Sequence, residues 1–313
     1  MDQVFDIVII GAGPAGLSAG LYAGRSKMKA LILEKDNNGG QIAITHAVEN
    51  YPGSIENATG PSLTKRMVEQ CQSFGTEIVR DTIESLELDG DVKKVIGEKG
   101  TYLGKTVIIA TGADARKIGC PGEKMFAGKG VSYCATCDAD FFEELEVFVV
   151  GGGDSAITEA LYLTRFARKV TIVHRREGLR ANKDSIEIAK ADPKIHWKLH
   201  KVVKEIKGDG ILESIVLEDT RDGELEEIFA DEDDGTMGVF VFIGMIPHTE
   251  LVKDILATDD EGYLITDDEM KTSIPGVFVA GDVRSKKVRQ VVTAASDGAV
   301  AAISAEHFIF GTP

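Results

Sequence analysis

Residues 5–16 of the chain read Phe5-Asp6-Ile7-Val8-Ile9-Ile10-Gly11-Ala12-Gly13-Pro14-Ala15-Gly16. The apolar run before the first glycine is typical of a strand buried on both faces of a parallel sheet. The Gly-x-Gly-x-x-Gly spacing predicts a tight turn into a helix, where the backbone can approach a pyrophosphate. A second predicted strand, 29–33, ends at Glu34, an acid about twenty residues on that is suited to a ribose hydroxyl pair. These features predict a dinucleotide-binding module, because a glycine-rich turn without a ligand would not need them in this order.

The same order of features returns in the middle of the chain. A strand is predicted at 147–150, a glycine turn at 151–156, a helix at 157–167 and another strand at 169–173. Short strands parted by turns follow each module, at about 77–107 and 197–229, and predict an antiparallel meander in each. Buried strands at 106–110 and 239–244 are expected to close the two modules. The chain is therefore predicted to be an internal duplication of one α/β plan.

The two modules differ in charge where the second strand ends. The first has Glu34, whereas the second has His174-Arg175-Arg176, with Arg180 four residues after Arg176. A carboxylate repels a ribose 2′-phosphate, and arginines pair with it. The first module is therefore predicted to take an unphosphorylated ribose and the second to take NADPH. The alternative is that these arginines form a solvated basic edge.

The last part of the chain is expected to return to the first module. A buried strand is predicted to end at Gly281-Asp282, and an apolar helix at 294–309 closes the sequence. The roughly 65 residues after the second module are too few for an independent third domain. We therefore expect one discontinuous domain, residues 1–114 and 248–313, and a second domain, residues 115–247, inserted into it.

A pair of cysteines, Cys134 and Cys137, is separated by two residues and followed by Asp138. Two thiols at this spacing can close and open a small disulfide ring, and a neighbouring carboxylate can move the accompanying proton. The alternative is half of a zinc site, but zinc needs four ligands at characteristic spacing. Cys71 and Cys120 stand alone, so we interpret them as ordinary thiols and expect no metal site. We therefore predict that Cys134 and Cys137 are a redox pair.

Composition excludes several classes of partner. The chain has 313 residues and a formal net charge of −16, which disfavours nucleic acid because binding there needs lysine and arginine stripes. No apolar run approaches the ~18 residues of a membrane span, and the acidic start is unlike a signal peptide. Four cysteines do not make a secreted disulfide framework at this length, so we expect a reducing cytoplasm.

With these motifs in place, the sequence closely resembles the low-molecular-weight thioredoxin reductases of bacteria over essentially its whole length. The resemblance rests on an ordered set of fragments: Gly11-x-Gly13-Pro14-Ala15-Gly16, Gly39-Gly40-Gln41, Ala110-Thr111-Gly112, Cys134-Ala135-Thr136-Cys137-Asp138, Gly151-x-Gly153-x-x-Ala156, His174-Arg175-Arg176, and Ala280-Gly281-Asp282 with Arg289-Gln290. Many related flavoproteins share the nucleotide motifs without the cysteine pair, so the pair identifies the subfamily.

The resemblance implies two three-layer, Rossmann-like domains that bind FAD and NADPH, each with an antiparallel meander and the second inserted into the first. The residues implied to contact FAD are Gly11, Gly13, Pro14, Ala15, Gly16, Glu34, Gly40, Gln41, Asn50, Thr111, Gly112, Gly281, Asp282, Arg289 and Gln290. Those implied to contact NADPH are Gly151, Gly153, Asp154, Ser155, Ala156, His174, Arg175, Arg176 and Arg180.

The resemblance also implies a mechanism and a partner. Electrons would pass from NADPH through FAD to the Cys134–Cys137 disulfide and then to oxidised thioredoxin. Cys137 would face the flavin, Cys134 would attack thioredoxin, and Asp138 would be the acid–base group. The domains would rotate about hinges near 113–117 and 244–248, and the family's homodimer is expected.

Two alternatives are kept. A related flavin disulfide reductase could use ferredoxin or NADH as the donor, or a different thiol–disulfide acceptor. The arginines and the second glycine turn argue against ferredoxin, which needs neither. A flavin protein that senses redox state through Cys134–Cys137 without turnover is the other alternative, but a sensor has no evident use for a second nucleotide site.

Overall fold

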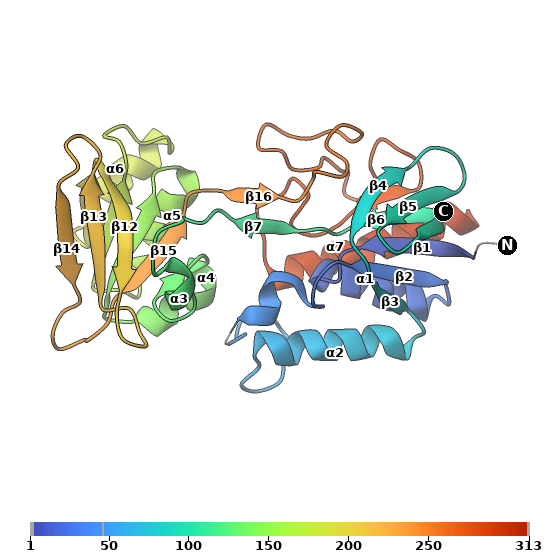
Figure 1. Ribbon diagram of the computed structural model, residues 1–313, viewed down its shortest axis with the longest axis horizontal. Coiled ribbons are helices and arrows are strands. Elements are labelled where there is room, and N and C mark those ends of the chain that lie inside the picture. Colours follow the sequence, from blue (N-terminus) through green and yellow to red (C-terminus); the bar gives the residue numbers. More distant parts are fainter. Residues whose placement is uncertain (1–2, 46, 312–313) are drawn as a thin grey trace. The chain divides into compact units, whose positions relative to one another are not determined.

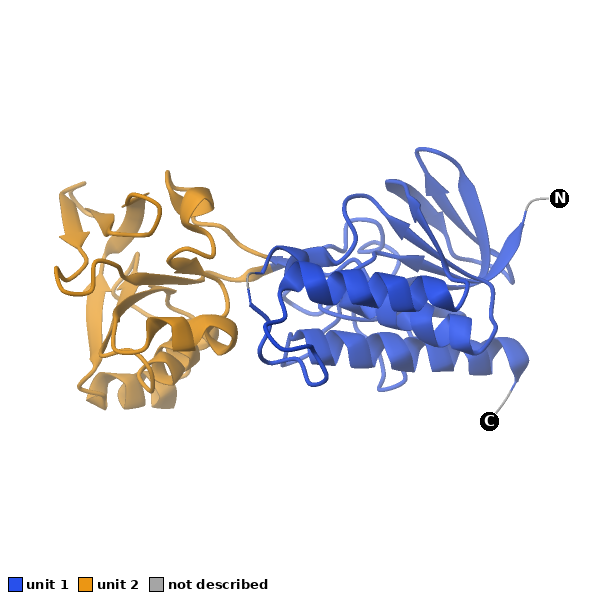
Figure 2. Ribbon diagram, turned by 90° about the horizontal axis from the view of Figure 1, so that it is seen from below, with its two compact units in different colours: residues 1–114, 246–313 blue, residues 115–245 orange. Residues whose placement is uncertain are grey.

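The computed structural model describes residues 3–45 and 47–311, and the chain divides into two compact units. The first unit contains residues 1–114 and 246–313, and the second contains residues 115–245 (Figure 2). The chain passes between the units along β7 (Ala113–Ala115) and β16 (Met245–Pro247), which pair as a two-stranded sheet. Each unit has a sheet with a parallel core of strands and hydrophobic packing of its own.

The first unit is built on one mixed sheet in the order β3-β2-β1-β6-β5-β4, with β17 also paired to β6 (Figure 1). Its strands are β1 (Val4–Ile10), β2 (Ala30–Glu34), β3 (Glu77–Arg80), β4 (Ile83–Glu87), β5 (Lys93–Gly97), β6 (Thr101–Ile109) and β17 (Val277–Val279). The long strand β6 pairs antiparallel with β5 through residues 101–104 and parallel with β17 through residues 107–109. One strand therefore joins the antiparallel part of the sheet to the parallel part.

Helices cover one face of this sheet. They are α1 (Pro14–Arg25), α2 (Gly60–Ser73) and α7 (Val291–Phe310), and a short 3₁₀ turn, η1 (Gly40–Ile44), precedes α2. A side chain at Gly298 of α7 would place its Cβ 2.0 Å from the carbonyl oxygen of Ala15, so α1 and α7 approach backbone to backbone. Ile9, Ile108 and Phe278 fill the core beneath these helices. The same strands present Val8 and Val107 to a second core on the opposite face.

The second unit repeats this plan with a parallel sheet in the order β11-β10-β9-β15-β8. Its strands are β8 (Val131–Ser132), β9 (Glu146–Gly151), β10 (Lys169–His174), β11 (Ile195–Leu199) and β15 (Gly238–Phe242). Two helices, α5 (Asp154–Leu163) and α6 (Lys183–Ala191), pack with one core. A separate antiparallel sheet of β12 (Lys201–Lys207), β13 (Ser214–Asp219) and β14 (Leu225–Phe229) packs with the other. Short helical turns, α3 (Glu123–Phe126), α4 (Ala135–Asp138) and η2 (Ala139–Phe142), complete the unit.

The predicted α/β duplication is confirmed, but both meanders start later than the sequence suggested. Residues 77–80 form β3, which pairs parallel with β2, and β11 pairs parallel with β10. The physical reason is a crossover helix before each of these strands, α2 in the first unit and α6 in the second, which brings the chain back in the parallel direction. These two helices were not predicted from the sequence. Within the described residues, no helix is both long and apolar enough to cross a bilayer.

Candidate functional site

The first glycine turn follows β1 and is shaped by close backbone contacts. Gly11 has φ +107°, and a Cβ there would lie 2.4 Å from the carbonyl oxygen of Ala110. A Cβ at Gly16 would lie 1.8 Å from the carbonyl oxygen of Gly11. The α1 helix begins at Pro14 without an acidic side chain in its first turn, so its N-terminal end suits an anion. The predicted pyrophosphate site therefore has the required backbone form.

Glu34, at the end of β2, lies directly beside this turn. Its Oε2 accepts a hydrogen bond from the Ala12 amide at 2.7 Å, and its Oε1 accepts one from the Asp36 amide at 2.9 Å. These bonds fix the direction of the carboxylate at the end of the strand. A carboxylate held there can accept the hydroxyls of a ribose, as in other modules of this form.

The second glycine turn follows β9 and has the same close approach. Gly151 has φ +156°, and a Cβ there would lie 2.4 Å from the carbonyl oxygen of Phe242. The Arg180 amide donates to the carbonyl oxygen of Gly152 at 2.7 Å, and the Asn182 amide donates to Asp154 Oδ1 at 2.7 Å. These two bonds hold the segment after β10 against the turn, and so bring Arg180 to it.

The predicted basic cluster separates into an exposed part and a buried part. Arg175, Arg176 and Arg180 are exposed. His174 is 9% exposed, and its Nδ1 lies 2.4 Å from where a Cβ of Gly152 would be. Burial, helped by the nearby arginines, lowers the pKa of His174. The imidazole therefore lies against the turn as a neutral packing group, and the three arginines are the side chains open to a phosphate.

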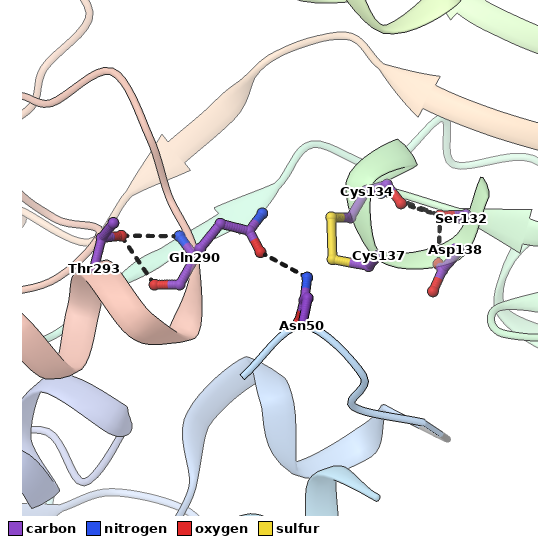
Figure 3. Close-up of a disulfide and its surroundings, with 7 residues drawn as sticks. All are labelled: Asn50, Ser132, Cys134, Cys137, Asp138, Gln290 and Thr293. Atoms are coloured by element: carbon purple, nitrogen blue, oxygen red, sulfur yellow. Dashed lines mark hydrogen bonds between the residues drawn. A yellow bond between two sulfur atoms is a disulfide. The ribbon is translucent and has the colours of Figure 1, made fainter. Parts of the chain in front are cut away.

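The two cysteines form a disulfide, with Cα atoms 5.3 Å apart, at the start of α4 (Figure 3). Ser132 Oγ donates to Asp138 Oδ2 at 2.6 Å and accepts from the Cys134 amide at 3.1 Å. Ser132 is 4% exposed, whereas both cysteines and Asp138 are half-buried. One buried hydroxyl therefore orients the carboxylate and the first cysteine together, which favours the redox reading of the pair over half a zinc site.

A buried carboxylate anchors the segment that leads to the disulfide. Glu123 is 4% exposed and accepts the amides of Ile118 and Gly119 at 2.8 and 2.7 Å, together with the Tyr133 hydroxyl at 2.9 Å. Burial and this carboxylate raise the pKa of Tyr133. Lys117 Nζ lies 3.4 Å from the centre of the Tyr133 ring. Tyr133, the residue before Cys134, is thereby held at both its ring face and its hydroxyl.

The remaining predicted residues of the first unit come together where the parallel strands end. Thr111 Oγ1 donates to the carbonyl oxygen of His248 at 2.7 Å, and His248 Nε2 lies 3.1 Å from Asp114 Oδ2. Gln41 Nε2 donates to the other oxygen of Asp114. Asn50 Nδ2 donates to Gln290 Oε1 at 3.2 Å (Figure 3). Asp114 and His248 were not predicted as site residues.

Asp282 and Arg289 lie in the loop between β17 and α7. The Arg289 guanidinium lies 3.8 Å from the centre of the Tyr263 ring, and its Nε donates to the carbonyl oxygen of Asp282 at 3.3 Å. Asp282 Oδ1 is buried and lies 3.2 Å from Lys286 Nζ. That distance makes an ion pair, yet no group of the described residues makes a well-directed hydrogen bond to this oxygen. A buried acceptor in this state fits the hydroxyl-bearing chain of a flavin.

The parallel strands explain why these residues meet. In the first unit, β1 leads to the first glycine turn, β2 ends at Glu34, β6 is followed by Thr111, and β17 is followed by Asp282. The carboxyl ends of parallel strands share one edge of the sheet, which is where such folds bind nucleotides. The second unit places its glycine turn and His174 at the corresponding edge, after β9 and β10.

Several residues that contact the predicted site residues were not themselves predicted from the sequence. They are Ser132 and Glu123 in the second unit and Asp114, His248, Arg284, Lys286 and Asp297 in the first. Ser132 precedes the cysteine pair by two residues, so a search of the flanking hydroxyls could have found it. Asp114 and His248 meet across the whole second unit of the sequence. The others contact residues nearer in the chain, but no local pattern marks them.

Comparison with known proteins gives consistent matches over the full chain. The sequence profile of the family described as "Pyridine nucleotide-disulphide oxidoreductase" matches residues 5–298. A thioredoxin reductase of Peptoclostridium acidaminophilum is 58% identical over 309 residues, covering 99% of this chain and 98% of that protein. One from Bacillus subtilis (strain 168) is 46% identical over 313 residues, covering 98% and 96%. The crystal structure of thioredoxin reductase from Streptococcus pyogenes MGAS5005 matches with a TM-score of 0.93 and 45% identity, covering 100% of both chains.

Proposed function

The chain belongs to the pyridine nucleotide-disulphide oxidoreductase family, and from that premise we propose that it is a thioredoxin reductase. With FAD bound, electrons from NADPH would reach the Cys134–Cys137 disulfide, and the reduced pair would pass them to oxidised thioredoxin. The observation that carries this proposal is the disulfide itself. It lies beside a carboxylate oriented by Ser132, in a chain with two glycine turns of nucleotide-binding form.

The residues of the first unit fit FAD. The open N-terminal end of α1 suits the pyrophosphate, Glu34 suits the adenosine ribose, and the buried oxygen of Asp282 suits a hydroxyl of the flavin chain. Gln41, Asn50, Arg289 and Gln290 are proposed to lie near the flavin. When bound, FAD supplies the chemistry that accepts a hydride from NADPH and passes two electrons to sulfur.

The residues of the second unit fit NADPH. The glycine turn at 151–156 would take the pyrophosphate, and the exposed Arg175, Arg176 and Arg180 would pair with the 2′-phosphate. We assign His174 a supporting role beneath Gly152, because its ring is buried there.

The cysteines then carry out two exchanges. Reduction of the disulfide takes two electrons and two protons and yields two thiols. The Cys134 thiolate attacks a sulfur of the thioredoxin disulfide, which forms a mixed disulfide and releases one thioredoxin thiolate. The Cys137 thiolate attacks Cys134, re-forms the ring and releases reduced thioredoxin. Asp138, held by Ser132, accepts and returns the proton at the cysteine sulfurs.

The two half-reactions need different groups at the flavin, so we propose that the units rotate between them. The segments at 113–117 and 244–248 are the proposed hinges. Main-chain hydrogen bonds flank the paired strands β7 and β16 at both ends. The Arg116 amide donates to the carbonyl oxygen of Gly244 at 2.9 Å, and the His248 amide donates to that of Gly112 at 3.0 Å. We also propose a homodimer, which the family resemblance implies, and a cytoplasmic location, which rests on the cysteine content of the chain.

Stopped-flow absorbance tests the proposal directly. The purified protein is mixed with NADPH or NADH and then with oxidised thioredoxin. The expected result is flavin bleaching that is much faster with NADPH, followed by reoxidation when thioredoxin is added. Bleaching without reoxidation would replace thioredoxin by another disulfide acceptor. No bleaching by either nucleotide would overturn the arginine assignment and favour a ferredoxin donor.

A further inference from the structure

The loop before α7 contains a group of buried charges that the sequence motifs do not include. Lys286 and Asp297 have side chains that are 9% and 10% exposed, and Arg284 has one that is 13% exposed. Asp297 projects from the second turn of α7, whereas the two cations come from the loop. With Asp282, the group has two negative and two positive side chains, so its formal charge is balanced. Charges this deeply buried persist in proteins when they are paired in this way.

Asp297 fixes the main chain at the end of β17. Its Oδ1 lies 3.1 Å from Arg284 Nη1, and its Oδ2 lies 3.0 Å from Lys286 Nζ. The same Oδ2 also accepts the Gly281 amide at 3.1 Å. Arg284 is held in turn by Thr266 Oγ1, at 3.0 Å from its Nε. Asp297 therefore connects α7, the loop and the peptide immediately before Asp282.

Lys286 fixes the side chain of Asp282. Its Nζ bridges the two carboxylates, at 3.2 Å from Asp282 Oδ1 and 3.0 Å from Asp297 Oδ2. Arg289 does not replace it, because the Arg289 Nε donates to the main-chain oxygen of Asp282. Burial and the nearby Asp297 raise the pKa of Asp282, and Lys286, followed by Arg289, opposes that rise. Lys286 is the cation in contact with the Asp282 side chain, so the direction of this carboxylate depends chiefly on Lys286.

We propose that Lys286, which Asp297 holds in place, is a positioning residue that keeps Asp282 an ionised acceptor for a hydroxyl of the flavin's sugar-alcohol chain. The inference rests on the proposed function, because it takes FAD as the ligand of the first unit. It deepens that function, because neither residue lies in a nucleotide-binding motif. The carboxylate oxygen that lacks a hydrogen bond is the acceptor that the ligand would use.

A double-mutant cycle on the flavin-loaded protein tests this role. The variants are Lys286→Met, Asp282→Asn and the double variant, with Lys286→Arg as the conservative replacement. Lys287→Met, at the exposed neighbouring residue, is the matched control. The readout is the rate of FAD release after dilution, followed by the fluorescence of the free flavin, which does not depend on turnover.

The expected result is coupling between Lys286 and Asp282. Lys286→Met should release FAD about tenfold faster than the parent, in the range measured for directly interacting pairs. Lys286→Arg should stay within about threefold, and Lys287→Met should match the parent. In the Asp282→Asn background the Lys286→Met change should add less than about threefold, because there is no longer a buried charge to balance.

Release from Lys286→Met at the parental rate, or equal effects in both backgrounds, would overturn the positioning role. If Lys286→Met folds only when Asp282 is also replaced, the coupling is supported; if both fail to fold, Lys286 serves packing alone and the proposal is overturned. A parent protein that contains no flavin would overturn the proposed function, whereas a flavin-containing parent with an indifferent Lys286 would overturn this inference only.

Discussion

The two glycine turns have nearly the same backbone but different neighbours. In both, the first glycine lies against the last carbonyl of an adjacent strand, 2.4 Å from Ala110 O for a Cβ at Gly11 and 2.4 Å from Phe242 O for a Cβ at Gly151. The third glycine position differs, because Gly16 is pressed against its own turn whereas Ala156 carries a side chain there. The shape of the turn is thus set by main-chain contacts that both units share.

The charge beside each turn is determined by the residues at the end of the neighbouring strand. The last residue of β2 is a carboxylate bonded to the turn amide of Ala12, and the last residue of β10 is a buried histidine followed by exposed arginines. A carboxylate and an arginine have opposite preferences for a 2′-phosphate. A duplicated scaffold can therefore take two different nucleotides by changing the charge at a single strand end, while the shape of the turn stays the same.

The largest effect is expected for the two cysteines of the second unit, because their replacement should stop thioredoxin reduction and leave both nucleotide sites intact. Cys134→Ser or Cys137→Ser should lower thioredoxin reduction by at least about 10³-fold, because the exchange loses a nucleophile or its leaving group. NADPH oxidation with an artificial quinone acceptor should continue, and the flavin spectrum should be retained. Loss of FAD from both variants would show that the pair is needed for structure and would remove the division between the units.

The next effect tests the charge difference between the strand ends. Replacing both Arg175 and Arg176 by Ala should raise KM for NADPH by at least about 100-fold, since each charge-assisted bond contributes about 1.5–3 kcal/mol. KM for NADH should change little, because that nucleotide lacks the phosphate. Arg165→Ala is the control, since Arg165 is exposed in the same unit and stacks on Tyr162. Equal losses for the two nucleotides would assign the arginines to a general basic surface.

A reciprocal exchange tests the difference at the third glycine position. Gly16→Ala should destabilise the first unit by about 1–3 kcal/mol, because the new Cβ would lie 1.8 Å from a backbone oxygen that cannot move freely. Ala156→Gly should cost about 1–2 kcal/mol in the second unit, through the lower helix propensity of glycine and the loss of a buried methyl group. Calorimetric unfolding of the two variants makes the comparison. A Gly16→Ala protein as stable as its parent would show that the turns are interchangeable.

A smaller effect is expected at the hydroxyl that orients Asp138. Ser132→Ala should reduce the rate of thioredoxin reduction by about tenfold, a part of the ~10²–10⁴-fold that a placed acid–base group contributes. Thr136→Ala, an exposed hydroxyl between the two cysteines, should leave the rate near that of the parent. Single-turnover reoxidation by thioredoxin is the measurement. An unchanged rate in Ser132→Ala would mean that Asp138 keeps its direction through other contacts.

The smallest effect is expected for the two thiols outside the disulfide, Cys71 in the first unit and Cys120 in the second. Burial raises the pKa of both Cys71 and Cys120 to about 11. Because a raised pKa keeps a thiol protonated below that value, neither should react with iodoacetamide at neutral pH, and labelling should increase only as the pH approaches about 11. Mass spectrometry should find both unlabelled in the oxidised protein, and two new labels at Cys134 and Cys137 after reduction. Rapid labelling of Cys120 would show that its segment opens.

Local patterns predicted a large part of this molecule. The strands β1, β2, β9 and β10 and the helices α1 and α5 occur where apolar runs and glycine turns placed them. The crossover helices α2 and α6 were missed, although Thr59 caps the first with a reciprocal side-chain bond and Asn182 caps the second. Both helices are amphipathic but rich in polar residues, and because they were not predicted, each meander was expected to start too early.

The sequence by itself determined the duplicated α/β plan, the charge difference between the two modules and the redox pair, because each depends on residues close together in the chain. Tertiary structure alone decided the pairing of Asp297 with Arg284 and Lys286, the burial of His174 under Gly152, and the contact of Gly298 with Ala15. The physical reason is that strand and turn preferences are local, whereas burial and ion pairing depend on which distant segments the sheet brings to the same edge.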